Sequence, residues 1–184
     1  MKNTALLVID VQKGLDHPSL GTRNNPQAES NIALLLAEWR KTGRPVIHVK
    51  HNSVEPQSKL RPELPGNEVK DEAKPLPAEK QYEKTVNSAF IGTDLEQYLH
   101  AQGIADLVVV GLTTDHCIST SVRMADNLGF KVTLISDATA AFETKGHDGA
   151  LFSADEIHNI SLATLNNEFC VIKSTQQLLN KVES

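Results

Sequence analysis

The chain alternates continuous apolar runs with stretches in which apolar residues recur every three or four positions. The run at residues 4–9 ends at Asp10, as is typical of a buried parallel strand. Residues 31–41 show the helical spacing and are followed by Gly43, a common helix terminator. The same patterns predict further strands at 45–49, 80–84, 107–110, 131–135 and 169–172, and further helices at 94–102, 115–128, 154–165 and 175–182.

This order of elements predicts one α/β domain over residues 1–184. Parallel strands are joined by crossover helices, which cover both faces of the sheet. We therefore expect a three-layer α/β/α fold with a six-stranded, mainly parallel sheet in Rossmann-like order. No internal repeat or linker interrupts the pattern.

The segment 51–79 departs from this pattern, because it has little periodicity and many charges. Loops of this length are uncommon in compact domains and are usually functional. We expect the segment to shape a ligand pocket, as a lid or as an interface. It contains five prolines, Pro56, Pro62, Pro65, Pro75 and Pro77.

Composition narrows the class of protein. Of the 184 residues, 40% are hydrophobic and 22% charged, as in an ordinary globular protein. The net charge of −5 disfavours nucleic acid and anionic membranes as partners. The sequence has no recognisable signal peptide or transmembrane segment. Its two cysteines, Cys117 and Cys170, form no disulfide framework, so we expect free thiols in the cytoplasm.

Three reactive side chains follow predicted strands: Asp10, Lys84 and Cys117. Ligands bind beyond the carboxyl ends of strands in open parallel sheets. A carboxylate near a thiol can accept its proton and return it to a leaving amine, and a nearby ammonium lowers the pKa of the thiol. Cys117 lies in the first turn of the helix predicted over 115–128, which also favours a thiolate, and the N–H groups of that turn could hold an oxyanion.

Each of these residues also has a structural interpretation. Asp10 could cap a turn, and Lys84 could be a solvated surface lysine. Cys117 could be a small buried hydrophobe, which is the better interpretation of Cys170 within its apolar run.

Other residues near the strand ends carry weaker hypotheses about substrate binding. Gln12 could hydrogen-bond a substrate amide or the backbone of the first turn. Phe90 could form a wall of the pocket or belong to the core, and His51 could be a polar residue of the pocket or of the surface.

The residues around Cys117 have simpler interpretations. His116 adjoins Cys117 in the sequence, but neighbours on a helix point apart, which disfavours it as the base. Thr114 or Asp115 is expected to cap the helix.

Around Asp10, Lys84 and Cys117 the chain resembles the isochorismatase-like cysteine hydrolases. The resemblance rests on the segments LLVIDVQ, KTVNSAF and GLTTDHCISTS, which hold these three residues, and on residues 136–142 and 158–165. It implies a catalytic Asp10–Lys84–Cys117 triad. It also implies a cis peptide bond at Leu112–Thr113, which aims the N–H of Thr113, with that of Cys117, at an oxyanion. Proteins of this family commonly form dimers or tetramers, so we expect a homo-oligomer.

The family that the chain resembles includes nicotinamidases, N-carbamoylsarcosine amidases, and biuret and ureidoacrylate hydrolases. Nicotinamidases hold a metal with an Asp-x-His and a further histidine after the second strand. Here the corresponding segment is Lys50-His51-Asn52-Ser53, which lacks that ligand set. We therefore predict no metal and no cofactor, and nicotinamide is disfavoured. Relatives that hydrolyse isochorismate lack the cysteine, so Cys117 disfavours that reaction too.

The leading hypothesis is a metal-independent cysteine hydrolase that cleaves a C–N bond of a small amide, ureide or carbamoyl compound through a thioester. The alternatives are an isochorismatase-type or nicotinamidase-type hydrolase, and a non-catalytic protein that binds small molecules or senses redox state through Cys117. A dinucleotide-dependent oxidoreductase is disfavoured, because the first strand is followed by DVQKG and not by G-x-G-x-x-G.

Overall fold

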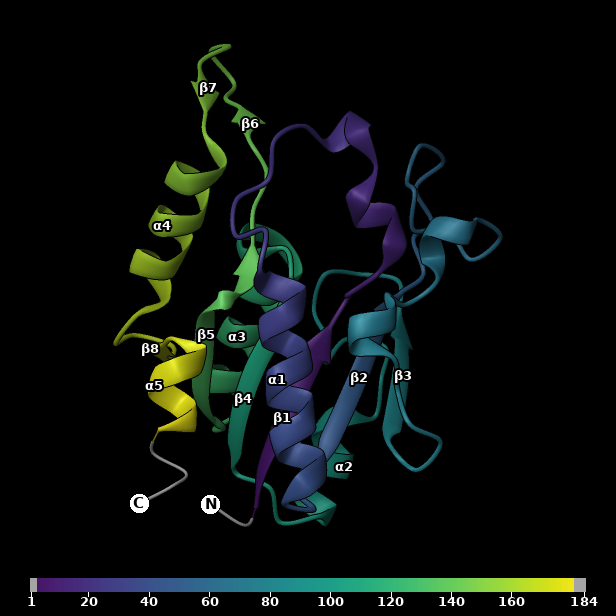
Figure 1. Ribbon diagram of the computed structural model, residues 1–184, viewed down its shortest axis with the longest axis vertical. Coiled ribbons are helices and arrows are strands. Elements are labelled where there is room, and N and C mark those ends of the chain that lie inside the picture. The colour runs from purple at the N-terminus through teal and green to yellow at the C-terminus, as the bar shows by residue number, and fades with distance from the viewer. Residues whose placement is uncertain (1–2, 181–184) are drawn as a thin grey trace.

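The six segments predicted as strands lie side by side in one parallel sheet (Figure 1). This computed structural model describes residues 3–180. The strand order is β3-β2-β1-β4-β5-β8, and each neighbouring pair is parallel, so the expected Rossmann-like order is confirmed. The strands are β1 (Thr4–Ile9), β2 (Val46–His51), β3 (Lys80–Lys84), β4 (Asp106–Leu112), β5 (Lys131–Ala140) and β8 (Val171–Lys173).

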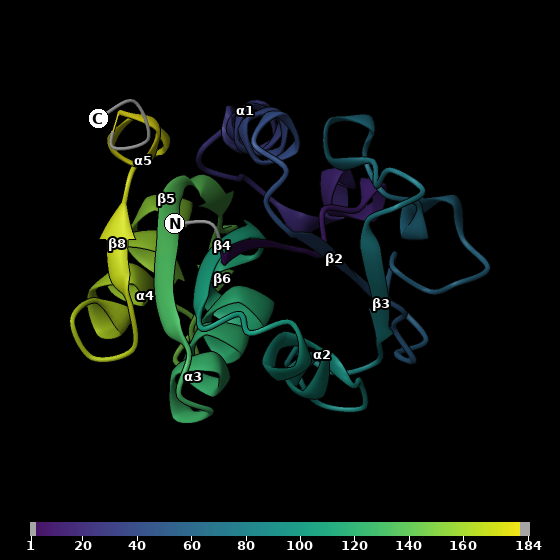
Figure 2. The same cartoon turned by 90° about the horizontal axis from the view of Figure 1, so that it is seen from below.

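Helices cover both faces of the sheet and complete the expected three layers. Figure 2 shows α1 (Ala28–Lys41) and α5 (Thr175–Leu179) on one side. The other side carries α2 (Leu95–Ala101), α3 (Ser119–Asn127) and α4 (Ala154–Leu165). Among the described residues, no helix is both long and apolar enough to span a bilayer.

The continuous apolar run of β1 follows from its central place in the sheet. Leu6 and Val8 pack with Leu35 and Trp39 of α1, whereas Leu7 and Ile9 belong to the cluster on the opposite face. Successive side chains of a strand point to opposite faces, so a strand covered on both faces needs apolar residues at every position.

The boundaries differ from prediction where the pattern was short or mixed. α1 begins at Ala28 and β5 extends to Ala140, five residues beyond the predicted end. This extension pairs with β4 beyond a register shift between Val109 and Gly111. The hairpin of β6 (Thr144–Lys145) and β7 (Leu151–Phe152) was not predicted, since two-residue strands show no periodicity. The predicted helix end at 182 lies outside the described residues.

The long segment after β2 takes the place of a crossover helix. It contains only short 3₁₀ helices, Pro65–Asn67 and Asp71–Ala73, yet it is firmly anchored. The buried ammonium of Lys70 forms ion pairs with Asp16 and Glu29, both 2.5 Å long. These bonds fasten the segment to α1 and to the chain after β1.

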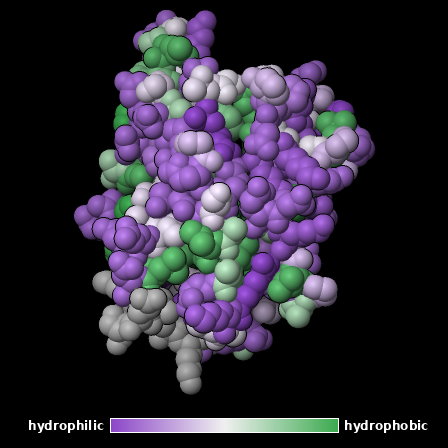
Figure 3. Space-filling view, viewed as in Figure 1, coloured by the Kyte–Doolittle hydropathy of each residue, from purple (hydrophilic) through white to green (hydrophobic). Residues whose placement is uncertain are grey.

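The surface viewed in Figure 3 is mostly hydrophilic, with small groups of apolar residues. One group lies at the tip of the β6–β7 hairpin, where the Leu151 residue is 68% exposed. The expected homo-oligomer stays a prediction.

Candidate active site

Asp10, Lys84 and Cys117 meet at the carboxyl edge of the sheet. Asp10 directly follows β1, Lys84 is the last residue of β3, and Cys117 lies in the helical turn after β4. The Lys84 Nζ atom donates a hydrogen bond of 2.6 Å to Oδ2 of Asp10 and lies 3.4 Å from Sγ of Cys117. Asp10 and Lys84 are almost fully buried. The structure thus brings the three predicted residues into contact.

The sequence favours a thiolate at Cys117, but the surroundings of this residue in the structure favour the thiol. Burial and the carboxylate of Asp10 raise the pKa of Cys117 to about 12, outweighing the effect of the Lys84 ammonium. Burial also raises the pKa of Asp10, against the opposing effect of Lys84. At neutral pH the resting nucleophile is therefore a thiol, and it needs a base to remove its proton during attack.

His51 is the fourth polar residue of this cluster. Its Nδ1 accepts a hydrogen bond of 3.1 Å from Lys84. Burial and the ammonium of Lys84 lower the pKa of His51 to about 4, so the ring is neutral at neutral pH. A neutral ring can accept from the ammonium without repelling it.

The residues present do not fit a resident metal ion. Ligand atoms of Asp10, His51 and Cys117 lie within 4.8 Å of one another. The ammonium of Lys84, however, is bonded to all three, so a cation held by them would have to displace it. Independence from metal is kept as a prediction.

The turn that carries Cys117 is a π-helix, Thr114–Ile118, which leads into α3. The Leu112–Thr113 peptide bond that precedes it is cis, as predicted. Both His116 and Ile118 donate their backbone N–H to the carbonyl of Thr113, at 3.2 Å each.

The predicted capping by Thr114 or Asp115 is wrong, because Thr113 is the N-cap and no side chain caps the turn. The hydroxyl of Thr114 instead lies 2.8 Å from Nδ1 of His158 and 2.9 Å from Oγ1 of Thr139. These buried contacts anchor the turn to α4 and β5. The carboxylate of Asp115 lies 3.3 Å from Nδ1 of His116.

His116 contacts Thr113 at 3.1 Å, and 66% of its side chain is exposed. It lines the cavity described next, but it makes no hydrogen bond to Cys117 among the described residues. This placement agrees with the expectation that His116 is not the base.

Cys117 and Asp10 open into a cavity of 320 Å³. Its walls come from the chain after β1, the segment after β2, the chain after β3, the end of β4 with the turn that follows it, and the chain after β5. The lining residues are Asp10, Leu15, Leu20, His51, Ser58, Leu60, Asn87, Leu112, Thr113, His116, Cys117, Phe142, Glu143 and Thr144. A mostly apolar cavity with a nucleophile at one end suits a small organic molecule.

Gln12 has a structural role and not the predicted contact with substrate. Its side-chain amide donates both hydrogens to backbone carbonyls, those of His51 and Asn67, at 2.9 Å each. Its oxygen accepts from the N–H of His51. The fully buried Gln12 therefore ties β1 to the end of β2, and it does not line the cavity.

Phe90 belongs to the core and not to the pocket wall. Its ring stacks on Phe130, with centroids 6.0 Å apart, and it packs in the cluster beneath α2 and α3. Of the two interpretations left open by the sequence, the structure supports the core.

Sequence reasoning missed the contribution of residues 13–24 and 141–144 to the cavity. These segments lie side by side through an antiparallel bridge between Arg23 and Phe142. Because a contact between residues so distant in the chain leaves no periodic pattern, the sequence carried no signal for Leu20, Phe142 or Glu143.

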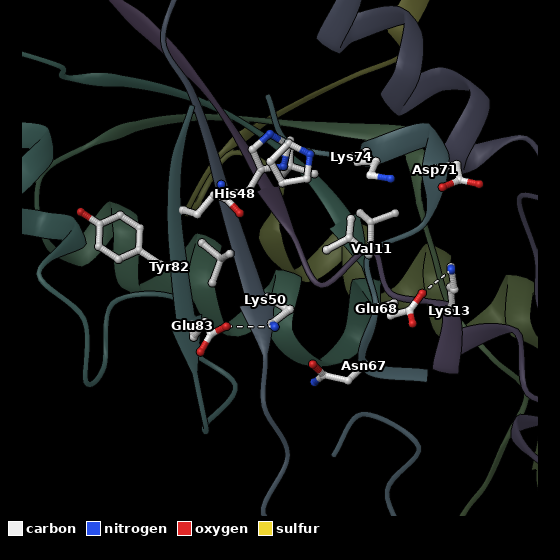
Figure 4. Close-up of a pocket in the computed structure, with 15 residues that line it drawn as sticks. Val11, Lys13, His48, Lys50, Asn67, Glu68, Asp71, Lys74, Tyr82 and Glu83 are labelled. Carbon is white, nitrogen blue, oxygen red and sulfur yellow. Dashed lines mark hydrogen bonds and ion pairs between the residues drawn. The ribbon is translucent and has the colours of Figure 1, made fainter. Parts of the chain in front are cut away.

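A larger hollow of 680 Å³ lies elsewhere, on the face of β2 and β3 that has no crossover helix. Figure 4 shows four of its charged residues in two ion pairs, Lys50 with Glu83 and Lys13 with Glu68. Asp10, Lys84 and Cys117 are not among its lining residues. The smaller cavity is therefore the candidate active site.

Comparison with known proteins agrees with this geometry. The family model described as the isochorismatase domain matches residues 4–177. The isochorismatase family protein YrdC of Bacillus subtilis is 48% identical over 176 residues, which cover 96% of this chain and 94% of that protein. A crystal structure of an isochorismatase-family protein from Chromobacterium violaceum has a TM-score of 0.96 and 45% identity, covering 100% of this chain and 95% of the other.

Two of the relatives are named after the compound that they hydrolyse. Streptothricin hydrolase of Streptomyces noursei is 31% identical over 76% of this chain and 50% of its own length. Nicotinamidase 3 of Arabidopsis thaliana is 28% identical, with 83% of this chain and 80% of its own length covered. The relatives thus include hydrolases with different substrates.

Proposed function

Because the chain belongs to the isochorismatase family, we propose that it is a cysteine hydrolase that cleaves a C–N bond of a small amide, ureide or carbamoyl compound. One observation carries the proposal: the buried ammonium of Lys84 contacts both the carboxylate of Asp10 and the sulfur of Cys117. A base, a cation and a nucleophile in mutual contact form the minimum set for covalent hydrolysis.

In the first half-reaction, Sγ of Cys117 forms a bond to the substrate carbonyl carbon while Asp10 takes the thiol proton. The high pKa of the thiol makes this transfer necessary at neutral pH. The N–H groups of Thr113 and Cys117 are the proposed donors to the oxyanion. When the C–N bond breaks, Asp10 returns the proton to the departing nitrogen, which leaves a thioester on Cys117.

In the second half-reaction, Asp10 takes a proton from water as the water oxygen attacks the thioester. The C–S bond then breaks, and the proton passes to the sulfur, which restores the thiol. Throughout, Lys84 balances the buried charge as it moves between Asp10 and Cys117, because a buried charge without a partner is costly.

The test is a release assay for ammonia or amine over small amides, ureides and carbamoyl compounds, without added metal and with chelator. We expect turnover by the unmodified chain and none by Cys117→Ala. Quenched samples should carry a mass increase equal to the acyl group on the peptide that contains Cys117. Turnover by Cys117→Ala would contradict this mechanism.

Cys170 offers a matched control within the same chain. Burial likewise raises the pKa of its thiol to about 12, but its hydrogen bond goes to the carbonyl of Leu165. Cys170→Ala should therefore keep its activity. An equal loss in both variants would point to general damage from removing a buried thiol.

A further inference from the structure

The charge of the cavity narrows the substrate beyond the bond that is cleaved. Its walls are mainly apolar, with Leu15, Leu20, Leu60, Leu112 and Phe142 as the large side chains. Of the described residues that line it, none is lysine or arginine. An anionic group of a ligand would have no unpaired cation to bind there, since the ammonium of Lys84 is already held by Asp10.

One acidic residue that lines the cavity has no partner for its carboxylate within the described part of the chain. Glu143 lines the wall, and among residues 3–180 its side chain makes no hydrogen bond or ion pair. The nearby cation Arg23 does not neutralise it, because both terminal nitrogens of Arg23 are bound by Glu29, at 2.6 and 2.7 Å. The residues that line the cavity therefore include one carboxylate whose charge no described cation balances.

The backbone fixes the position of this carboxylate. The N–H of Glu143 donates to the carbonyl of Thr22 at 2.8 Å, and Ala141 bonds to the side chain of Asn24 at 2.8 Å. The side chain of Glu143 lies over Gly21, where a Cβ atom would come within 2.7 Å of its Oε1. Gly21 has a φ of 82°, a conformation that favours glycine, and a larger residue there would displace the carboxylate of Glu143.

We propose that Glu143 is a specificity-determining residue that selects substrates with a protonated amine at the end distant from the scissile bond. This inference rests on the proposed function and deepens it. The substrate class is a small amide with an apolar spacer and an ammonium group, and a cavity of 320 Å³ restricts its size. Amides that carry a carboxylate instead are rejected, because they would meet a like charge.

The first test measures selectivity with three amides of similar length. Hexanamide is neutral, 5-aminopentanamide replaces its terminal methyl group with an ammonium, and glutaramate ends in a carboxylate. For the unmodified chain, kcat/KM should follow the order cation, neutral, anion. Glu143→Gln should lower kcat/KM for 5-aminopentanamide about tenfold relative to kcat/KM for hexanamide. A similar loss with both substrates would overturn the proposal.

A second test does not depend on turnover. Alkyl methanethiosulfonates form a mixed disulfide with a cysteine, and they exist in neutral, 2-aminoethyl and 2-sulfonatoethyl forms. In a Cys170→Ser background, we expect the ratio of the 2-aminoethyl rate to the 2-sulfonatoethyl rate at Cys117 to fall about tenfold in Glu143→Gln. Glu143→Asp, which keeps the charge, should retain most of the ratio.

Glu55→Gln is the matched control, since it removes the same charge from a residue that does not line the cavity. An equal change of the labelling ratio in Glu55→Gln and Glu143→Gln would overturn the proposal. If Glu143→Gln alone changes the ratio but no amide is hydrolysed, the selectivity of the cavity stands and the proposed hydrolase function fails. Thermal unfolding of each variant confirms that it is folded.

Discussion

Gly111 of β4 approaches Ile9 of β1 so closely that a Cβ atom at Gly111 would lie 1.9 Å from the carbonyl oxygen of Ile9. Gly111 has a φ of 127°, a conformation that side chains rarely adopt. Asp10 follows Ile9 directly, and the turn with Cys117 begins three residues after Gly111. The contact between two backbones thus sets where the base and the nucleophile leave the sheet.

Gly111→Ala should therefore destabilise the fold severely. No flexible side chain can move aside for the added methyl group, so we expect the free energy of unfolding to fall by more than about 4 kcal/mol. Urea denaturation followed by circular dichroism measures this. Gly43→Ala is the control: Gly43 also has a positive φ, 65°, but a Cβ atom there would meet nothing within 4 Å. It should cost only about 1–2 kcal/mol, and equal losses in both variants would contradict the steric argument.

Asp10→Asn should separate thiol reactivity from catalysis. The carboxylate is one cause of the raised pKa of Cys117, so its removal should lower that pKa and speed alkylation by iodoacetamide at pH 8. Turnover should nevertheless fall by about 10²–10⁴-fold, because the general base is lost. Slower alkylation in Asp10→Asn would show that the carboxylate does not oppose the thiolate.

Lys84→Met should lower both activity and stability. It leaves the carboxylate of Asp10 buried without its cation, and breaking a buried ion pair in this way costs about 3–5 kcal/mol. Adding Asp10→Asn removes the orphaned charge, so the double variant should recover part of the lost free energy of unfolding but none of the activity. No recovery in urea denaturation would mean that Lys84 stabilises by packing alone.

Acid should weaken the anchoring of the segment after β2. Burial alone would raise the pKa of Glu29, but hydrogen bonds from Arg23 and Lys70 lower it to about 2. A carboxyl whose pKa is lowered by folding stabilises the protein above its unfolded value near 4.5 and loses that effect as pH falls toward 2. The contribution is on the order of 3 kcal/mol for this buried group.

We therefore expect the free energy of unfolding to fall between pH 5 and pH 2, and to fall less steeply in Glu29→Gln. Urea denaturation at several pH values measures the slope. Glu55 makes no ion pair among the described residues, so Glu55→Gln should keep the pH dependence of the unmodified chain. The same slope in Glu29→Gln would contradict the role of this ion-pair network.

The elements that the sequence predicted well are those with a continuous apolar run or a periodic apolar pattern. The run before Asp10 and the helix before Gly43 each have a pattern set by their own neighbours, so their positions and the order of the sheet followed. The extension of β5 was missed because it depends on a register shift in β4. The hairpin of β6 and β7 was too short to leave a pattern.

The site was predictable in its reactive residues and not in its surroundings. Asp10, Lys84 and Cys117 stand at strand ends, which a sequence reveals. The protonation state of Cys117 depends on burial and on the distance to Asp10, which it does not reveal. The same holds for Gln12 and Phe90, whose partners lie 39 or more residues away.

The place of Lys84 in the sheet has a consequence for how activity is lost. β3 is an edge strand of the sheet, and β2 is its single neighbour. Edge strands open locally at a lower free energy than central strands do. Fraying of β3 would withdraw the ammonium from Asp10 and Cys117 while β1 and β4 stay paired. Mild heating or denaturant should thus inactivate the protein before it unfolds, with amide hydrogen exchange at β3 keeping pace with the loss.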